Sequence, residues 1–210
     1  MIQSWLGTCK PLLHTLNCGL DKVVRPRIRL LGSWIPAFQV CGGIGAALAA
    51  LLGAALAAYQ GLSPWMMVAI GLTAVSVLLG LTMVTKVISG EERIVNYHHQ
   101  AGVLVVTAVL LRLGSYPLLP YLDVVMLGVG LFIACGRIGC LMMGCCHGRP
   151  HPWGVRYRQG HVAFGFAPTY VGVRLYPVQA VESLWLFCVV LGGSIAVLRD
   201  QPPGIALSWY

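Results

Sequence analysis

Charged residues are scarce in this chain. Of its 210 residues only 10% are Asp, Glu, Lys or Arg, just 6 residues are acidic, and 58% are hydrophobic. A soluble domain carries about 25% charged and about 45–50% apolar residues. This shortage of charge, with a mean hydropathy of +0.80, argues against a soluble enzyme, a disordered segment and a disulfide-stapled secreted domain. It predicts an integral membrane protein.

The shortage of acidic residues leaves a net charge of +8, from 14 Lys and Arg against 6 Asp and Glu. In a soluble chain this excess would suggest a nucleic-acid partner. In a membrane chain it is more typical of topology signals or of contact with anionic lipid head groups. We therefore expect no nucleic-acid partner.

Several uncharged or nearly uncharged runs are long enough to cross a bilayer, which takes about 20 apolar residues. Four runs are clear candidates. A fifth, poorer run is interrupted by an arginine, a glycine and a proline, and we expect it to be a short or re-entrant helix. Residues 204–210 are similar to the first turns of a further span, which suggests that the chain is truncated there. The fold class predicted is an all-α polytopic membrane helical bundle with about 5–6 spans. The four clear runs and the poorer one are Ile35–Tyr59, Trp65–Ile88, Leu122–Met143, Pro177–Leu198 and Gly102–Leu119.

Residues 1–33 predict a basic interfacial segment ahead of a transmembrane domain over 34–210. Charged and proline residues interrupt every apolar stretch there, so the core of a cleavable signal peptide is missing. An amphipathic helix on the membrane surface is the interpretation. Eleven of the 14 Lys and Arg fall in this segment, in the 86–93 region and in the loop 147–175. Five spans would put all three on one side, and the positive-inside rule makes that side cytoplasmic.

Two ionisable residues stand out inside predicted spans, where such residues are costly and usually functional. Arg137 carries a permanent positive charge and lies in the sequence Gly136-Arg137-Ile138-Gly139, so a glycine is close on either side. Glu182 lies six residues into its span, and Arg137 is its obvious partner. Two interpretations stay open: a structural ion pair inside the bundle, or a site for a lipid phosphate.

Three of the eight cysteines, Cys140, Cys145 and Cys146, cluster at the end of the span that contains Arg137. Together with His147 they could be read as metal ligands. Zinc sites, however, usually show a Cys-x-x-Cys hook and a second pair of ligands at a distance. Adjacent cysteines also rarely pair with each other, because the geometry is strained. We expect no metal, and a membrane thiol-redox or metal protein is the less favoured hypothesis.

The loop 147–175 is basic, rich in aromatic residues and free of acidic ones. Arginine suits bidentate contacts to phosphate, and aromatic residues anchor at the head-group layer. The loop therefore predicts a site for an anionic lipid or a membrane-tethered substrate, with a purely topological role as the alternative. Separately, His98 and His99 precede an apolar segment, where an imidazole could act as a general base. The loop arginines are Arg149, Arg156, Arg158 and Arg174.

Residues 136–149, GRIGCLMMGCCHGR, resemble the signature Gly-Arg-x-Gly-Asn-Phe-x-Asn-x-Glu-x-x-Gly of the prolipoprotein diacylglyceryl transferases. Weaker similarities follow in the family's order. Residues 35–38 (IPAF) are similar to the start of the family's first helix, and 99–102 (HQAG) to its His-Gly-Gly segment. Residues 176–182 (YPVQAVE) are similar to its His-Pro-Ser-Gln-Leu-Tyr-Glu motif.

The resemblance implies a multi-pass enzyme of the bacterial inner membrane. It places the signature loop and the N-terminus on the periplasmic side, which opposes the cytoplasmic side that the charge count favours. Such an enzyme moves a diacylglyceryl group from phosphatidylglycerol, or a related anionic phospholipid, to the lipobox cysteine of a prolipoprotein signal peptide, and glycerol phosphate leaves. The implied chemistry needs no cofactor. The resemblance implies His99, Arg137 and Glu182 as catalytic residues. It implies a lipid-binding set of Arg137, Gly139, Cys140, Gly144, Cys145, Gly148, Arg149 and Gln179, to which the basic loop adds Arg156 and Arg158.

The sequence also departs from the family pattern. Cys140 and Met143 stand at the two asparagine positions of the signature, and Cys145 stands at its glutamate. These substitutions keep a second hypothesis open, a non-catalytic phospholipid-binding or complex-forming paralogue. A further hypothesis, based on its place at the signature's glutamate, is that Cys145 forms a covalent bond to an acyl or glyceryl group during transfer. The family's last helix would lie beyond Tyr210, so a partner chain completing the bundle is a further expectation.

Overall fold

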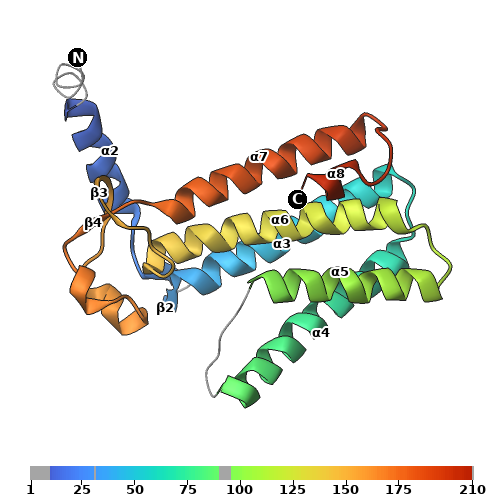
Figure 1. Cartoon of the computed structure of the whole chain (residues 1–210), viewed down its shortest axis with the longest axis horizontal. Helices are drawn as coiled ribbons and strands as arrows, with labels where there is room; N and C mark the ends of the chain where they lie inside the picture. The colour runs from blue at the N-terminus through green and yellow to red at the C-terminus, as the bar shows by residue number, and fades with distance from the viewer. Residues whose placement is uncertain (1–9, 31, 90–95, 210) are drawn as a thin grey trace. The chain divides into compact units, whose positions relative to one another are not determined.

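The computed structural model describes residues 10–30, 32–89 and 96–209 and divides the chain into two compact units. The first comprises Met1–Ala46 and Phe132–Phe187, and the second comprises Ala47–Leu131 and Cys188–Tyr210. Figure 1 shows three long helices, α3 (Ala37–Tyr59), α6 (Leu118–Met143) and α7 (Val178–Leu198). Each of them contributes one part to either unit. Residues 1–9 and 31 of the predicted interfacial segment, and 90–93 of the basic 86–93 region, lie outside the described residues. The predicted boundary between 33 and 34 remains a prediction.

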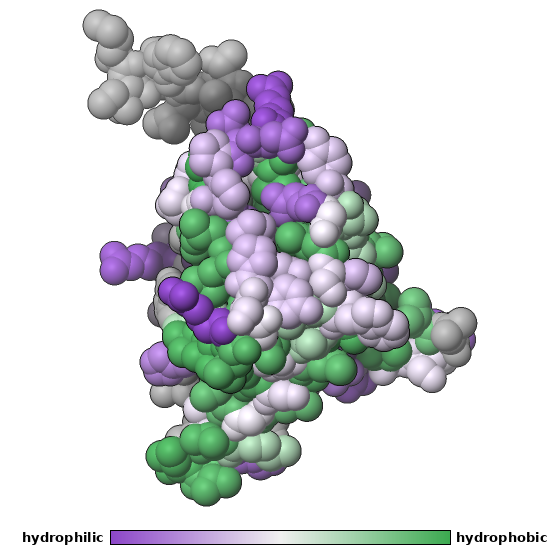
Figure 2. All heavy atoms as spheres, turned by 90° about the vertical axis from the view of Figure 1, so that its right-hand side faces the viewer, coloured by the Kyte–Doolittle hydropathy of each residue, from purple (hydrophilic) through white to green (hydrophobic). Residues whose placement is uncertain are grey.

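Helices make up most of the described chain, with two small two-stranded sheets. Among the described residues, four helices are long and apolar enough to cross a membrane: α3, α4, α6 and α7. A shorter apolar stretch, His98–Leu113, lies in α5. Figure 2 shows hydrophobic side chains exposed among polar ones on the face that it draws. The exposed large hydrophobic residues include Leu51, Leu72 and Trp185 of the apolar helices, as expected for surfaces that meet lipid. The prediction of a polytopic membrane helical protein is confirmed. The elements are α2 (Lys10–Val23), β1 (Arg27–Leu30), β2 (Ser33–Pro36), α3 (Ala37–Tyr59), α4 (Pro64–Ser89), α5 (Asn96–Leu113), α6 (Leu118–Met143), β3 (Pro150–Arg156), η1 (Gln159–Phe164), η2 (Pro168–Tyr170), β4 (Arg174–Leu175), α7 (Val178–Leu198) and α8 (Ile205–Ser208).

The boundary between α5 and α6 corrects the sequence prediction. The apolar run expected over Gly102–Leu119 begins earlier and ends at Leu113. Ser115 has φ of +56° and reverses the chain, and the amide of Tyr116 bonds back to the Leu111 carbonyl at 2.9 Å. Helix α6 then begins at Leu118 rather than at Leu122, because the first turn of a helix tolerates Pro120.

In the second unit, small residues allow parts of the long helices to pack closely. A Cβ added at Gly128 of α6 would lie 3.6 Å from the Ala49 carbonyl oxygen of α3. A Cβ added at Gly193 of α7 would lie 2.5 Å from the Leu127 side chain. Without a hydrophobic driving force between helices in lipid, such close packing is a main source of association. Gly193 therefore lets α7 approach Leu127 more closely than a larger residue would, whereas a methyl group at Gly128 would meet α3 in ordinary contact.

Asp123 is a buried carboxylate in α6 of the second unit, and sequence reasoning did not single it out. It is 2% exposed and accepts hydrogen bonds from the backbone amides of Gly204, at 2.6 Å, and Leu207, at 2.8 Å. Both donors belong to the start of α8, whose amides have no partner within the helix. The carboxylate therefore has a structural role: it holds the segment 204–208 against α6.

Replacing Asp123 with asparagine is expected to destabilise this attachment by about 1–3 kcal/mol. One acceptor oxygen becomes an NH2 group, which then faces a backbone N–H. Hydrogen exchange of the amides of residues 204–208 should accelerate, with little change in α4. Unchanged protection of those amides in Asp123→Asn would show that the carboxylate does not anchor α8.

The first unit contains the small sheets that sequence reasoning did not predict. Strands β1 and β2 form an antiparallel hairpin with Arg27 opposite Pro36. Within the predicted loop 147–175, β3 and β4 pair, with a bulge between Pro150 and Val155. Two 3-10 helices lie between these strands. The region expected as a loop is thus a folded head, here defined as residues 147–175.

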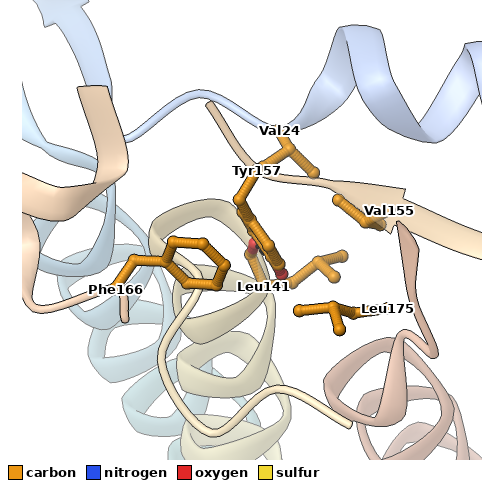
Figure 3. Packing of buried hydrophobic residues seen from close by; sticks show 6 residues of the cluster. All are labelled: Val24, Leu141, Val155, Tyr157, Phe166 and Leu175. Atoms are coloured by element: carbon orange, nitrogen blue, oxygen red, sulfur yellow. Dashed lines mark hydrogen bonds between the residues drawn. The ribbon is translucent and has the colours of Figure 1, made fainter. Parts of the chain in front are cut away.

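One hydrophobic cluster holds the head to the end of α6. The Tyr157 and Phe166 rings pack with centroids 4.7 Å apart, and the Tyr157 hydroxyl donates a hydrogen bond to the Leu141 carbonyl at 2.9 Å. Burying each such large side chain contributes about 1.5–3 kcal/mol. The head is therefore a fixed platform rather than a loose loop. The cluster is made of Val24, Leu141, Val155, Tyr157, Phe166 and Leu175 (Figure 3).

Helix α2, predicted from the sequence as an amphipathic helix, packs on β3 through polar contacts. Asp21 forms an ion pair with Arg174 at 2.8 Å and accepts a hydrogen bond from the Arg156 amide at 2.9 Å. Asn17 accepts a hydrogen bond from the Gly154 amide at 3.0 Å. Helix α2 is thus part of the folded first unit.

Candidate functional site

An ion pair lies at the centre of the candidate site in the first unit. Arg137 of α6 and Glu182 of α7 approach to 2.8 Å between Nη2 and Oε2, and their side chains are 21% and 42% exposed. The pairing predicted from the sequence is therefore present. Ser183, the next residue of α7, donates a hydrogen bond to the Ala134 carbonyl at 2.8 Å and fixes the two helices locally. Arg137 is thus a positioned cation that retains some access to its surroundings.

Two glycines of the signature, Gly139 and Gly144, determine the backbone geometry next to this ion pair. A Cβ added at Gly139 would lie 3.0 Å from the Phe38 Cα, so glycine lets α3 approach α6 closely here. Gly144 follows the last helical residue and has φ of +88°, the left-handed conformation that ends many helices. A Cβ at Gly144 would also lie 2.9 Å from the Phe166 ring. The chain therefore turns sharply at Gly144 and brings the next residues back over the helix end.

The turn gathers the three clustered cysteines. The side chains of Cys140, Cys145 and Cys146 lie within hydrogen-bond reach of one another, and that of Arg137 reaches Cys146. Hydrogen bonds from Cys140 and Cys145, with the charge of Arg137, hold the pKa of the Cys146 thiol well below its usual range. Hydrogen bonds with Cys140 and Cys146, together with burial, raise the pKa of the Cys145 thiol.

Gln179 joins α7 to this turn. It is fully buried, and its Nε2 donates a hydrogen bond to the Cys145 carbonyl at 2.7 Å. Position 148 requires a glycine, because a Cβ there would lie only 2.6 Å from the Tyr176 carbonyl oxygen. The Tyr176 amide in turn bonds to the Arg149 carbonyl at 3.0 Å. Gln179, Gly148 and Arg149 thus hold the chain after α6 beside the start of α7.

The head arginines divide into two groups. Arg174 is occupied by Asp21 and by the Gly154 carbonyl, and so has a structural role. Arg156 and Arg158 instead line a cavity of about 450 Å³ within the first unit. Its other lining residues are Asp21, Tyr157, Gln159, Val171 and Gly172.

His99 belongs to the second unit, whereas Arg137 and Glu182 belong to the first. Its side chain is 5% exposed, and its Nε2 lies 3.3 Å from the Thr82 hydroxyl of α4. The neighbouring His98 is exposed. His99 is thus buried next to a polar group, whereas His98 is exposed.

Sequence reasoning missed Tyr157 and His161 as individual polar groups near the site. His161 is 2% exposed and accepts a hydrogen bond from the Arg158 amide at its Nδ1, at 3.1 Å. Burial lowers the pKa of His161 and raises that of Tyr157, so both are neutral at physiological pH. Their place within the aromatic loop was visible in the sequence, but their burial depends on contacts with Leu141 and its neighbours.

Within the described ranges, no group of three or more His, Cys, Asp or Glu side chains is arranged to hold a metal ion. The described cysteines are all free thiols. The described side chains at the site include a guanidinium, a carboxylate, an amide and thiols.

Comparison with known proteins adds independent information. The family model for prolipoprotein diacylglyceryl transferase matches residues 97–209, just over half of the chain. A phosphatidylglycerol–prolipoprotein diacylglyceryl transferase of Clostridium tetani is 36% identical over 75 residues, which is 35% of this chain and 28% of that protein. One of the same name from Dehalococcoides mccartyi is 34% identical over 85 residues, covering 40% of this chain and 31% of that protein.

The aligned segments thus span less than a third of the length of these curated relatives. The family match, in contrast, includes all but the first residue of α5, and the whole of α6, the head, α7 and α8. Both sides of the Arg137–Glu182 ion pair fall inside it. This chain therefore belongs to the prolipoprotein diacylglyceryl transferase family.

Proposed function

We propose that this protein transfers a diacylglyceryl group from phosphatidylglycerol to the lipobox cysteine of a prolipoprotein, in a bacterial inner membrane. The observation that carries the proposal is the Arg137–Glu182 ion pair inside the segment that matches the family. Charged residues between apolar helices are energetically costly in a membrane. They are therefore rare there and usually mark a functional site. The names of the relatives support phosphatidylglycerol as the donor.

In the proposed reaction, the sulfur of the substrate cysteine forms a bond to the terminal carbon of the diacylglyceryl group. The bond between that carbon and the phosphate oxygen breaks, and its electron pair leaves with glycerol phosphate. Arg137 stabilises the phosphate through paired N–H donors, which are most effective where water is scarce. Glu182 orients the guanidinium, and Arg149, Arg156 and Arg158 attract the anionic head group.

The remaining site residues have shaping roles in this proposal. Gly139, Gly144 and Gly148 allow the chain to turn closely around the head group. Gln179, Cys140 and Cys145 line the position of the phosphate. The resemblance to the family implies His99 as the group that takes the proton from the substrate thiol. Cys140 and Cys145 stand where the family signature has an asparagine and a glutamate, so this lining is less polar than the signature's.

The proposal is tested by incubating the purified protein with phosphatidylglycerol and a lipobox peptide, and by measuring glycerol-phosphate release. We expect release that depends on the peptide. Binding of phosphatidylglycerol without release would overturn the transferase proposal and favour the phospholipid-binding alternative.

His99→Ala is expected to slow release by about 100-fold, because general-base catalysis contributes at least this much in many enzymes. Binding of phosphatidylglycerol should survive, since the proposed phosphate contacts are those of Arg137. His98→Ala, a change at the exposed neighbouring histidine, is the matched control and should keep the full rate. Equal rates for the two variants would remove His99 from the mechanism.

A further inference from the structure

The three cysteines at the end of α6 are gathered by the backbone, not by sequence proximity alone. The amide of Gly144 bonds to the Cys140 carbonyl at 2.9 Å, and the Cys145 thiol approaches the same carbonyl at 3.8 Å. Cys146 has φ of +53°, which is rare for a residue with a side chain. The left-handed residues Gly144 and Cys146 thus reverse the chain twice and bring Cys145 and Cys146 back toward Cys140 at the end of α6.

Arg137 lies one turn before Cys140 on α6, so the two side chains share a face of the helix. Its guanidinium forms the ion pair with Glu182 and also reaches the Cys146 side chain. A nearby arginine favours the thiolate form of cysteine, which is the nucleophilic form. Cys146 is also exposed, whereas Cys140 and Cys145 are only partly so. An accessible thiol beside a cation therefore has two further thiols within reach.

Other described cysteines lack this combination. Cys41 and Cys135 lie within apolar helices, and Cys188 faces outward from a membrane-spanning helix. Cys18 of α2 is exposed but has His14 as its neighbour, at 3.8 Å, rather than an arginine and further thiols. Cys18 is therefore a suitable reference for ordinary thiol reactivity in the same protein.

We propose that Cys140 and Cys146 form a reversible dithiol–disulfide site beside Arg137, with Cys146 as the attacking thiol and Cys140 as the resolving one. Cys146 attacks a small-molecule disulfide such as glutathione disulfide, forms a mixed disulfide and releases one thiol. Cys140 then attacks the Cys146 sulfur and releases the second thiol. Two protein thiols are oxidised, one external disulfide is reduced to two thiols, and the atoms balance.

Cys140 is assigned as the resolving residue rather than Cys145 because a disulfide between adjacent residues is geometrically strained. Closing the Cys140–Cys146 bond removes the thiolate from beside Arg137. The guanidinium then has Glu182 as its remaining anionic contact in the cluster and is freer to meet another anion. The site thus links thiol oxidation to the charge environment of Arg137, independently of whether diacylglyceryl transfer takes place.

The experiment oxidises the full-length protein in detergent with glutathione disulfide at neutral pH and maps the products by mass spectrometry of proteolytic peptides. We expect an intramolecular Cys140–Cys146 disulfide, formed at least tenfold faster than Cys18 is glutathionylated. Cys140→Ser should stop at a glutathione adduct on Cys146. Cys146→Ser should leave Cys140 and Cys145 reduced, and Cys18→Ser should behave as the unaltered protein.

Two results would overturn the proposal. One is a Cys146 that reacts no faster than Cys18, since Arg137 would then not activate it. The other is a disulfide that forms in Cys140→Ser but not in Cys145→Ser, which would make Cys145 the resolving residue. Because the readout is the thiol state, a protein without transferase activity gives an equally clear answer.

Discussion

Arg137→Ala is expected to lower the rate of glycerol-phosphate release by about 1,000-fold, because removing a preorganised donor to developing charge in a dry site has an effect of this order. Arg137→Lys should recover part of the rate, since lysine keeps the charge but loses the paired donor geometry of the guanidinium. Initial rates in detergent with phosphatidylglycerol and a lipobox peptide measure both effects. Arg199→Ala, a change at an exposed arginine just after α7, should keep the full rate.

Loss of Arg137 also leaves Glu182 without its partner, and an unpaired charge in a membrane can destabilise the fold. The double variant Arg137→Ala/Glu182→Gln removes this charge and separates the two effects. We expect it to be folded and still inactive. A double variant with the full rate would contradict a role for Arg137 at the phosphate.

Gly154→Ala is expected to destabilise the first unit by about 2–5 kcal/mol. Gly154 has φ of +147°, and a Cβ there would overlap the Leu175 carbonyl oxygen, a backbone atom of the paired strand β4. The Gly154 amide and carbonyl also contact Asn17 and Arg174, so a shift of β3 disturbs the attachment of α2. Thermal unfolding in detergent should show a clearly lower transition temperature.

The matched control is Gly160→Ala in η1. A Cβ at Gly160 meets nothing within 4 Å, and its backbone is not left-handed. Its transition should therefore move little, as for most surface substitutions. If Gly154→Ala were as stable as Gly160→Ala, the tight pairing of β3 with β4 described here would be wrong.

The membrane-spanning helices could be predicted from the sequence because each is encoded locally, by a run of apolar residues as long as the bilayer is thick. The pairing of Arg137 with Glu182 was also predictable. Two ionisable residues of opposite charge in predicted spans have few alternatives to pairing with each other. The family similarity lay in the same short motifs and could be read from them directly.

The folded head could not be predicted in the same way. Its β3–β4 pair and the burial of Tyr157 depend on contacts between distant parts of the chain, such as those of α2 with β3. Asp123 was missed for a similar reason. It lies near the start of a span, and its partners, the amides of Gly204 and Leu207, are about 80 residues away in the sequence. The roles proposed for His99, Arg137 and Glu182 rest on the resemblance and remain predictions.

The most direct measurement uses the unaltered protein in vesicles of phosphatidylglycerol with a peptide that has one lipobox cysteine. Glycerol phosphate and the diacylglyceryl-modified peptide are quantified together over time. We predict that the two products appear in equal amounts and that both disappear when the peptide cysteine is replaced by serine. Glycerol phosphate released without modified peptide, or neither product from protein that binds the lipid, would contradict diacylglyceryl transfer as the function of this chain.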